Sequence, residues 1–152
     1  MEIILAENHG FCYGVKRAVE MANEAADSDG KSYTLGPIIH NPQVVGRLES
    51  KGVSPIQEVS DIDEGTMIIR SHGVGPAIYE EAEEKGLNIL DATCPHVKKA
   101  QQDAKSVIED GMTLVILGEK NHPEVKSINL WANNKGIIIE DEESAQKLQI
   151  VE

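Results

Sequence analysis

Short apolar runs of strand length alternate with amphipathic segments of helical length along the whole chain. The apolar runs predict strands at residues 3–6, 32–35, 66–71, 87–91, 112–118 and 137–140. Apolar positions at helical spacing predict helices at residues 15–26, 42–50, 76–85, 95–109, 123–131 and 142–148. The run MTLVILG at 112–118 is the clearest candidate for a buried strand. A strand, a loop and a helix therefore repeat six times, which is typical of parallel sheets joined by right-handed crossovers.

The predicted fold class is α/β, with parallel sheets flanked by helices. A length of 152 residues suffices for one ordinary domain or two small ones. We place a boundary near residues 93–95, which predicts a first α/β domain at 1–94 and a second, related one at 95–152. No long linker or low-complexity tract is found in the sequence.

Composition supports this fold class and excludes several functions. Hydrophobic residues make up 40% of the chain and aromatic residues only 3%, so aliphatic side chains must form the core, as they do in parallel sheets. The formal charge is 14 − 26 = −12, which argues against a nucleic-acid partner and against electrostatic binding to a membrane. An anionic ligand would have to be bound locally, by histidines, backbone amides and helix starts.

The chain carries no predicted membrane or export signal. No stretch approaches the roughly 20 apolar residues of a membrane span. The first residues, MEIILAENHG, have the pattern of a strand and a turn rather than of a basic leader with an apolar core. Two cysteines without a secretion signal favour a reducing, cytoplasmic location.

Five potentially reactive side chains lie just before predicted helices. They are Cys12, His40, His72, Cys94 and His122. Each has a glycine or a proline close by, and proline favours the first helical turn. Loops that connect strand ends to helix starts share one edge of a parallel α/β sheet, where such folds bind ligands. We therefore expect two thiols and three imidazoles to gather at one edge.

Each of these residues also has an ordinary structural interpretation. Cys12 and Cys94 are either two buried free thiols or ligands of a metal or cluster, because helix starts favour thiolates. The three histidines are either hydrogen-bonded loop residues or donors to phosphate oxygens. Glu124 is either a first-turn glutamate stabilised by the helix dipole or a proton donor whose pKa rises in a crowded anion site. A zinc site of two cysteines and two histidines is a further alternative.

Other prominent side chains are assigned structural roles. We expect Lys16, Arg17, Lys98 and Lys99 to lie on solvated helix faces, and Trp131 to contribute packing. No phosphate loop and no complete dinucleotide fingerprint is present in the sequence.

Five segments carry a resemblance to a known family. GFCYGVKRAV, IIHNPQVV, IIRSHGVGP, LDATCPHVKK and GEKNHPEV occur in the order seen in the 4-hydroxy-3-methylbut-2-enyl diphosphate reductases, the LytB family. The similarity covers nearly the whole chain. It implies a trefoil-like arrangement of three related α/β domains around a central 4Fe-4S cluster, of which this chain contains the amino-terminal portion.

The resemblance also implies roles for single residues. Cys12 and Cys94 match two of the three cysteines that hold the cluster. Glu124 matches the acid that delivers protons to the bound substrate. Three histidines match the residues that surround the diphosphate of the substrate, namely His40, His72 and His122.

The family reaction is a two-electron reductive dehydroxylation that yields isopentenyl and dimethylallyl diphosphates. The resemblance implies a ferredoxin- or flavodoxin-like protein as the electron donor. The third cysteine of the family, and the Ser and Asn residues that complete the diphosphate cage, have no counterpart in these 152 residues. We therefore expect the isolated chain to be inactive unless a third domain or a second chain completes it.

Overall fold

The first structural unit is a parallel four-stranded sheet with helices on both faces. The computed structural model describes residues 1–7, 9–28 and 30–148. In sheet order, the strands are β2 (Val53–Ile56), β1 (Ser32–Leu35), β3 (Thr66–Ile69) and β4 (Asn88–Asp91). All three strand pairings are parallel. This arrangement confirms the α/β class with parallel sheets.

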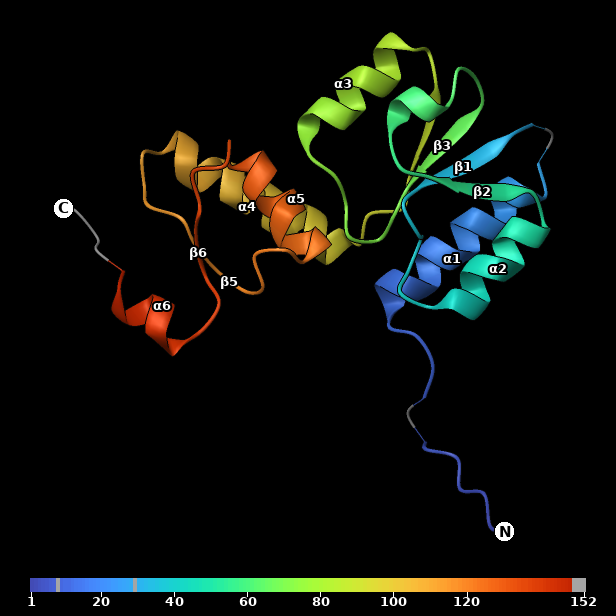
Figure 1. Ribbon diagram of the computed structural model, residues 1–152, viewed down its shortest axis with the longest axis horizontal. Coiled ribbons are helices and arrows are strands. Elements are labelled where there is room, and N and C mark those ends of the chain that lie inside the picture. The colour runs from blue at the N-terminus through green and yellow to red at the C-terminus, as the bar shows by residue number, and fades with distance from the viewer. Residues whose placement is uncertain (8, 29, 149–152) are drawn as a thin grey trace.

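Helices cover the two faces of this sheet unequally (Figure 1). On one face lie α1 (Tyr13–Ala26) and α2 (Pro42–Ser50), and on the other α3 (Pro76–Glu84) with the short 3₁₀ turn η1 (Val59–Asp61). The carboxyl ends of β1 and β3 lead directly into α2 and α3. The loops between them are therefore brought to the same edge of the sheet.

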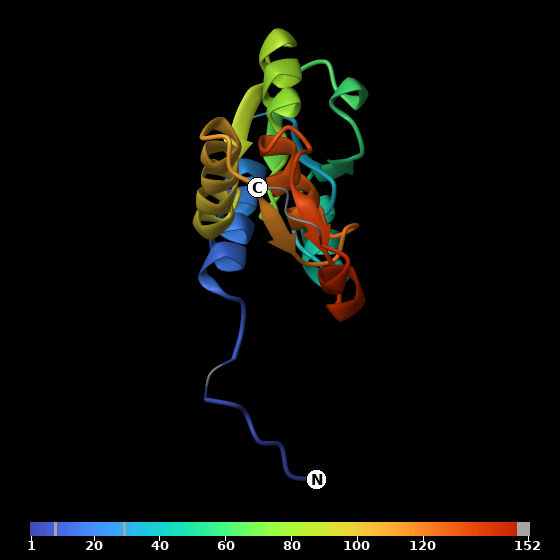
Figure 2. The same ribbon diagram turned by 90° about the vertical axis from the view of Figure 1, so that its left-hand side faces the viewer.

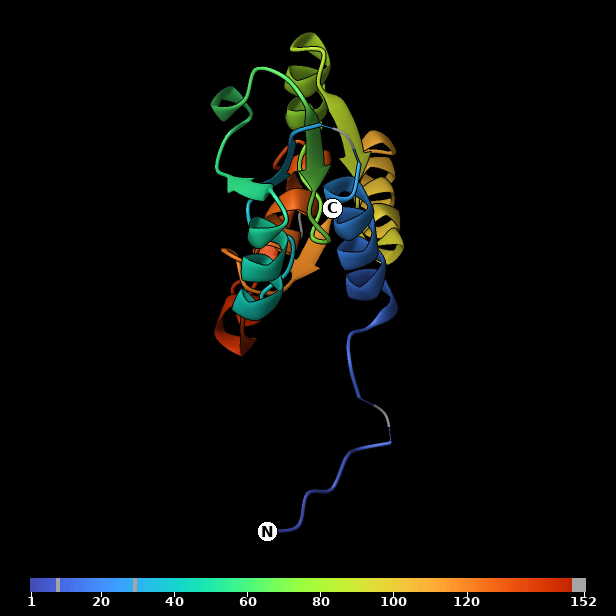
Figure 3. The ribbon, with the colours of Figure 1, turned by 90° about the vertical axis from the view of Figure 1, so that its right-hand side faces the viewer.

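The second unit follows in the chain and is smaller. Its elements are α4 (Pro95–Glu109), β5 (Val115–Leu117), α5 (Pro123–Trp131), β6 (Ile137–Ile139) and α6 (Glu142–Gln146). The two strands pair in parallel, and α4 and α5 pack against each other. Figure 2 views the molecule from the side of this unit, and Figure 3 views it from the side of the four-stranded sheet. The two sheets lie on either side of residues 94 and 95, while the division into domains at that point stays a prediction.

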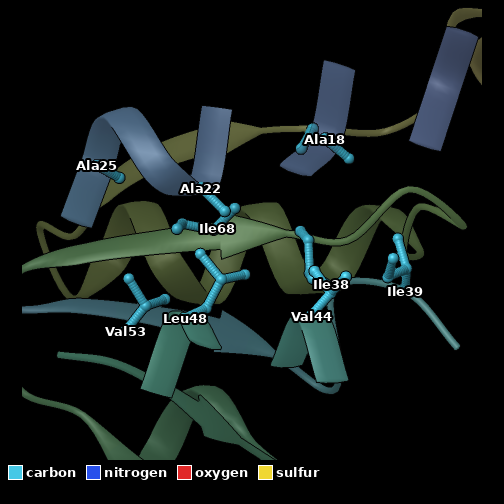
Figure 4. Packing of buried hydrophobic residues seen from close by; sticks show 10 residues of the cluster. Ala18, Ala22, Ala25, Ile38, Ile39, Val44, Leu48, Val53 and Ile68 are labelled. Carbon is cyan, nitrogen blue, oxygen red and sulfur yellow. The ribbon is translucent and has the colours of Figure 1, made fainter. Parts of the chain in front are cut away.

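The main core lies between α1, α2 and the sheet (Figure 4). Ala18, Ala22 and Ala25 occupy one stripe of α1 and are almost completely buried. Their small side chains let the helix approach β3, where Ile68 is 0% exposed. Close packing of this kind holds α1 against the sheet.

Truncating the centre of this core should be costly. We expect Ile68→Ala to lower the free energy of unfolding by about 2–5 kcal/mol, because a buried cavity is created in a strand with helices on both faces. Leu117→Ala is the matched control, since Leu117 lies on a strand but is 79% exposed, and it should change stability by less than about 0.5 kcal/mol. Urea unfolding followed by circular dichroism measures both. Equal losses of stability in the two variants would contradict the burial of Ile68 and the exposure of Leu117.

The strand predictions differ from the structure at three places, apart from shifts of one or two residues at strand ends. Residues 3–6 form no strand and are exposed, because no described strand lies alongside to satisfy their backbone groups. Strand β2 was not predicted, because Ser54 and Pro55 interrupt its apolar pattern. Pro55 is tolerated there because β2 is an edge strand.

The run at 112–118 is not the most buried strand. Only Ile116 of β5 is buried, and Val115 and Leu117 are exposed, because β5 has a single neighbouring strand. The helix predictions agree more closely with the structure. The helices predicted at 42–50, 95–109 and 123–131 have these bounds in the structure. Within the described part of the chain, no helix has both the length and the apolar character needed to cross a bilayer.

Candidate functional site

Three imidazoles from distant parts of the chain meet at one place. His40 follows β1, His72 follows β3 and His122 follows β5, each shortly before the next helix. The ring centroids of His40 and His72 lie 4.7 Å apart, those of His72 and His122 5.7 Å, and those of His40 and His122 6.3 Å. One nitrogen from each ring lies within 4.8 Å of the others. The three imidazoles thus meet as expected, although His122 reaches the group from the two-stranded sheet rather than from the edge that carries His40 and His72, and neither cysteine belongs to this group.

His72 is the most enclosed member of the cluster. Burial, followed by the charges of His40, Arg70 and His122, lowers the pKa of His72 to about 4. Its ring is therefore neutral at pH 7 and carries one N–H donor. Its Nδ1 is buried and has no hydrogen-bond partner among the described residues. A neutral, enclosed imidazole can donate to an anion or ligate a metal without first losing a proton.

Helix starts support the other two histidines. The side chain of Asn41, next to His40, accepts a hydrogen bond from the backbone of Val44 at 3.1 Å and caps α2. His122 caps α5, since its Nδ1 accepts from the backbone N–H of Glu124 at 3.3 Å. That bond leaves Nε2 of a neutral His122 as the protonated, donating nitrogen. Both helices direct their positive dipole ends towards the cluster.

Glu124 lies in the first turn of α5 and is half-buried. Its backbone N–H binds His122, and its backbone carbonyl accepts a hydrogen bond from Ser127 at 3.0 Å. The first turn of α5 therefore carries both an imidazole and a carboxyl group. This placement agrees with either interpretation of Glu124, and its role as a proton donor stays a prediction.

The two cysteines each occupy a helix start. Cys12 is at the N-cap position of α1 and is exposed, Cys94 is at the N-cap position of α4 and is half-buried, and both are free thiols. Gly14 packs against the second thiol so closely that a Cβ on Gly14 would lie 2.5 Å from the Cys94 Sγ. A thiolate at a helix start is stabilised by the dipole and is a soft ligand suited to iron. The residues thus fit two ligands of an iron–sulfur cluster, and a complete set needs at least one more.

Arg17 connects the two helix starts, which corrects its assignment to a solvated face. Its guanidinium donates hydrogen bonds to the backbone carbonyls of Thr93, at 3.2 Å, and Asp91, at 3.5 Å. These carbonyls follow the end of β4 and need donors that the sheet does not supply. Arg17 on α1 therefore holds the segment that leads into Cys94.

Lys98 is likewise not a purely solvated residue. Its ammonium lies 2.6 Å from the Asp91 carboxylate, which also accepts hydrogen bonds from the Tyr79 hydroxyl and the backbone of Thr93. Burial alone would raise the pKa of Asp91, but the hydrogen bonds from Lys98, Thr93 and Tyr79 together hold it below the ordinary value. Asp91 therefore stays ionised and braces the end of β4, three residues before Cys94.

Trp131 packs as expected and also binds the neighbouring loop. Its ring meets that of Tyr79 edge to face, with centroids 6.2 Å apart. Its indole N–H donates to the backbone carbonyl of Val74 at 2.9 Å. The second unit is thus attached to the loop that follows His72.

A buried polar pair was missed by the sequence analysis. Gln101 Nε2 donates to Ser127 Oγ at 3.2 Å, and Ser127 Oγ donates to the backbone carbonyl of His72 at 2.8 Å. Both side chains are 2% exposed. The available signal was Gln101 itself, which interrupts the apolar stripe of α4 between Val97 and Ala104. This pair ties the loop of His72 to the helix of His122.

The depressed pKa of His72 predicts a pH dependence of stability. An unfolded histidine titrates near pH 6.5, whereas His72 in the folded chain titrates at about 4. Below pH 6.5 the unfolded state binds a proton that the folded state does not, so the free energy of unfolding should fall between about pH 6.5 and pH 4. Urea unfolding at several pH values should show a shallower fall for His72→Asn. The control His96→Asn, at an exposed position of α4, should keep the original slope, and identical slopes for all three proteins would contradict the assignment.

Comparison with known proteins identifies the family of the chain. The sequence model of the LytB protein family matches residues 3–152. The 4-hydroxy-3-methylbut-2-enyl diphosphate reductase of Geotalea uraniireducens is 52% identical over 148 residues, which cover 97% of this chain and 52% of that protein. The reductase of the same name from Caldanaerobacter subterraneus is 48% identical, with coverage of 100% and 54%. The chain therefore spans about half the length of the curated relatives it matches.

Two solved structures share the fold. A structure of (E)-4-hydroxy-3-methyl-but-2-enyl diphosphate reductase, described as the terminal enzyme of the non-mevalonate pathway, superposes with a TM-score of 0.82 at 48% identity and covers 95% of this chain and 53% of that one. The E-1-hydroxy-2-methyl-but-2-enyl-4-diphosphate reductase from Plasmodium falciparum gives a TM-score of 0.91 at 32% identity, with coverage of 95% and 46%.

Proposed function

The chain belongs to the LytB protein family, and we propose that it forms the part of a 4-hydroxy-3-methylbut-2-enyl diphosphate reductase that binds the diphosphate and supplies two cluster ligands. The observation that carries this proposal is the meeting of three imidazoles within 4.8 Å at helix starts. An acidic protein with a net charge of −12 needs such a local donor set to hold an anion. The relatives named as reductases support the choice of an oxidoreductase acting on an allylic diphosphate.

The proposed reaction replaces the hydroxyl group of the substrate by hydrogen. The carbon–oxygen bond breaks, two electrons and two protons enter, and the products are water and isopentenyl or dimethylallyl diphosphate. A 4Fe-4S cluster held by Cys12, Cys94 and a cysteine outside these 152 residues would supply the electrons, received from a ferredoxin- or flavodoxin-like donor. Two free thiols in a chain of this kind support a cytoplasmic location.

The protein residues bind the substrate and deliver protons. His40, His72 and His122 donate hydrogen bonds to the diphosphate oxygens, and the starts of α2 and α5 add their dipoles. His72 stays neutral at pH 7 and can therefore donate without a change of protonation. Glu124 lies in the first turn of α5, two residues after His122, and delivers a proton towards the leaving hydroxyl group.

Restoring the rest of the enzyme tests this proposal. A chimaera would join residues 1–152 to the carboxyl-terminal half of the Geotalea uraniireducens reductase. Purified without oxygen and given a chemical reductant, it should convert 4-hydroxy-3-methylbut-2-enyl diphosphate to the two C5 diphosphates, measured by mass spectrometry. The isolated chain should give no product. A folded, iron-loaded chimaera without activity, beside an active parent reductase, would refute the proposal.

Two alternatives have observations in their favour. A non-catalytic module that binds a small phosphorylated ligand would use the same three histidines, and binding would then survive in the Cys12→Ser, Cys94→Ser double variant without any iron in the parent chain. A zinc site could be formed by the three imidazoles, whose nitrogens are close enough for one ion. Stoichiometric zinc, with neither iron nor acid-labile sulfide, would favour that site over the reductase.

A further inference from the structure

A separate cavity of ≈ 310 Å³ lies behind the loops of the histidine cluster. Gly73 and Pro123, which directly follow His72 and His122, line it, whereas the three histidines do not. Its charged lining residues are Arg70 and Lys126. The volume is at the lower end of the range for small-molecule sites. The cavity and the histidine cluster therefore use neighbouring residues of the same two loops.

Arg70 has an unusual environment for a cation. Its Nε is buried and has no hydrogen-bond partner in the part of the chain that the structure describes. The guanidinium packs against the backbone of Gly36, where a Cβ would lie 2.9 Å from Nη1. Burial lowers the pKa of Arg70, yet an arginine remains protonated at neutral pH. A buried donor without an acceptor is costly, so this guanidinium is suited to receive an anion.

Among the described residues, no carboxylate forms an ion pair with Arg70. The ion pairs formed there all use lysines as the cation, and none includes Arg70. The only other charged group that lines the cavity is Lys126, which adds a second positive charge. The charged residues that line the cavity are thus both positive, whereas the chain as a whole has a net charge of −12.

The rest of the lining defines what kind of anion fits. Four aliphatic side chains form much of the wall, namely Leu35, Val74, Ile78 and Leu130. A planar guanidinium binds a carboxylate or a phosphate through two parallel hydrogen bonds. We propose that this cavity is a second anion site, in which Arg70 and Lys126 bind a small organic carboxylate or phosphate monoester whose short apolar group lies against the aliphatic wall.

Two probes of the same shape distinguish the two head groups. The ¹⁵N-labelled chain is titrated with 3-methylbutanoate and with 3-methylbutyl phosphate at pH 7, and NMR follows the Arg70 Nε–H and the backbone amides of Gly73 and Val74. We expect saturable shifts of these signals with at least one probe. Arg70→Gln and Lys126→Gln should each weaken that binding at least about tenfold, the loss expected when one charge-assisted hydrogen bond is removed.

A matched control removes the same charge elsewhere. Arg47→Gln, at an exposed position on α2, should leave the affinity unchanged. Shifts confined to His40 and His122 would place the anion in the histidine cluster and overturn the second site. If Arg70→Gln loses the native spectrum, Lys126→Gln decides, and an unaltered affinity overturns the proposal. Activity of the chimaera does not enter this test, so failure here leaves the proposed reductase function intact.

Discussion

Replacing Cys94 with Ser is expected to remove the iron that the chimaera binds. Iron should fall from about four atoms per chain to less than about one, with an equal loss of acid-labile sulfide and of the cluster EPR signal. The reason is that a serine hydroxyl at the start of α4 is a hard, protonated donor that does not replace a thiolate. Cys12→Ser at the start of α1 should have the same effect, because Gly14 and Arg17 hold the two helix starts together.

His96→Gln is the control for this loss of iron. His96 lies two residues after Cys94 in the same helical turn, and its side chain is exposed. Its substitution should leave iron, sulfide and spectrum unchanged. A Cys94→Ser chimaera that keeps its full iron content and EPR signal would show that this thiol is not a ligand. Thermal unfolding of each variant distinguishes loss of cluster ligation from loss of the folded structure.

Glu124→Gln should lower kcat of the chimaera by about 10²–10⁴-fold, the range expected when a positioned proton donor is lost. Glutamine keeps the shape of the side chain and its place in the first turn of α5 but cannot deliver a proton. KM should change much less than kcat, because the histidines that bind the diphosphate remain. Steady-state kinetics with a chemical reductant measure both constants.

Glu119 provides a matched control for this loss of activity. It is exposed in the loop that leads to His122, and within the described part of the chain only its backbone carbonyl forms a hydrogen bond, which it accepts from the His122 N–H. Glu119→Gln should therefore leave kcat within a factor of about two, as expected for an exposed side chain outside the site. A comparable kcat for the Glu124→Gln and parent proteins would assign the proton to another group and leave Glu124 as a first-turn residue stabilised by the helix dipole.

Much of the fold could be predicted from the sequence because proline marks the helix starts. Pro42, Pro76, Pro95 and Pro123 each open a helix at the predicted residue. The alternation of strand and helix then indicated that the histidine loops share an edge, which the structure confirms for His40 and His72, while His122 joins them from the second sheet. Buried and edge strands were harder to distinguish, because composition does not reveal how many neighbours a strand has. Strand β5 is aliphatic yet largely exposed for this reason.

The hydrogen bonds and ion pairs that hold the site residues in place could not be predicted, because the groups that they join are distant in sequence. Arg17 binds carbonyls 74 and 76 residues away, and Ser127 binds one 55 residues away. A backbone carbonyl has no sequence signature, so these bonds leave no motif to recognise. Lys98 forms an ion pair with Asp91, and that pair depends on how α4 leaves the sheet. Sequence spacing therefore locates the reactive groups and gives little information about what holds them in place.

The origin of the three imidazoles has a consequence for how the protein acquires its binding site during folding. His40 and His72 come from the four-stranded sheet, and His122 comes from the two-stranded one. Parallel pairings close long loops and are slow to form. A folding intermediate with only the first sheet in place would hold two of the three rings and bind an anion weakly. During refolding, full affinity for the anion would therefore return only when the second sheet docks. The rate at which anion binding recovers would then report the rate of this last step of assembly.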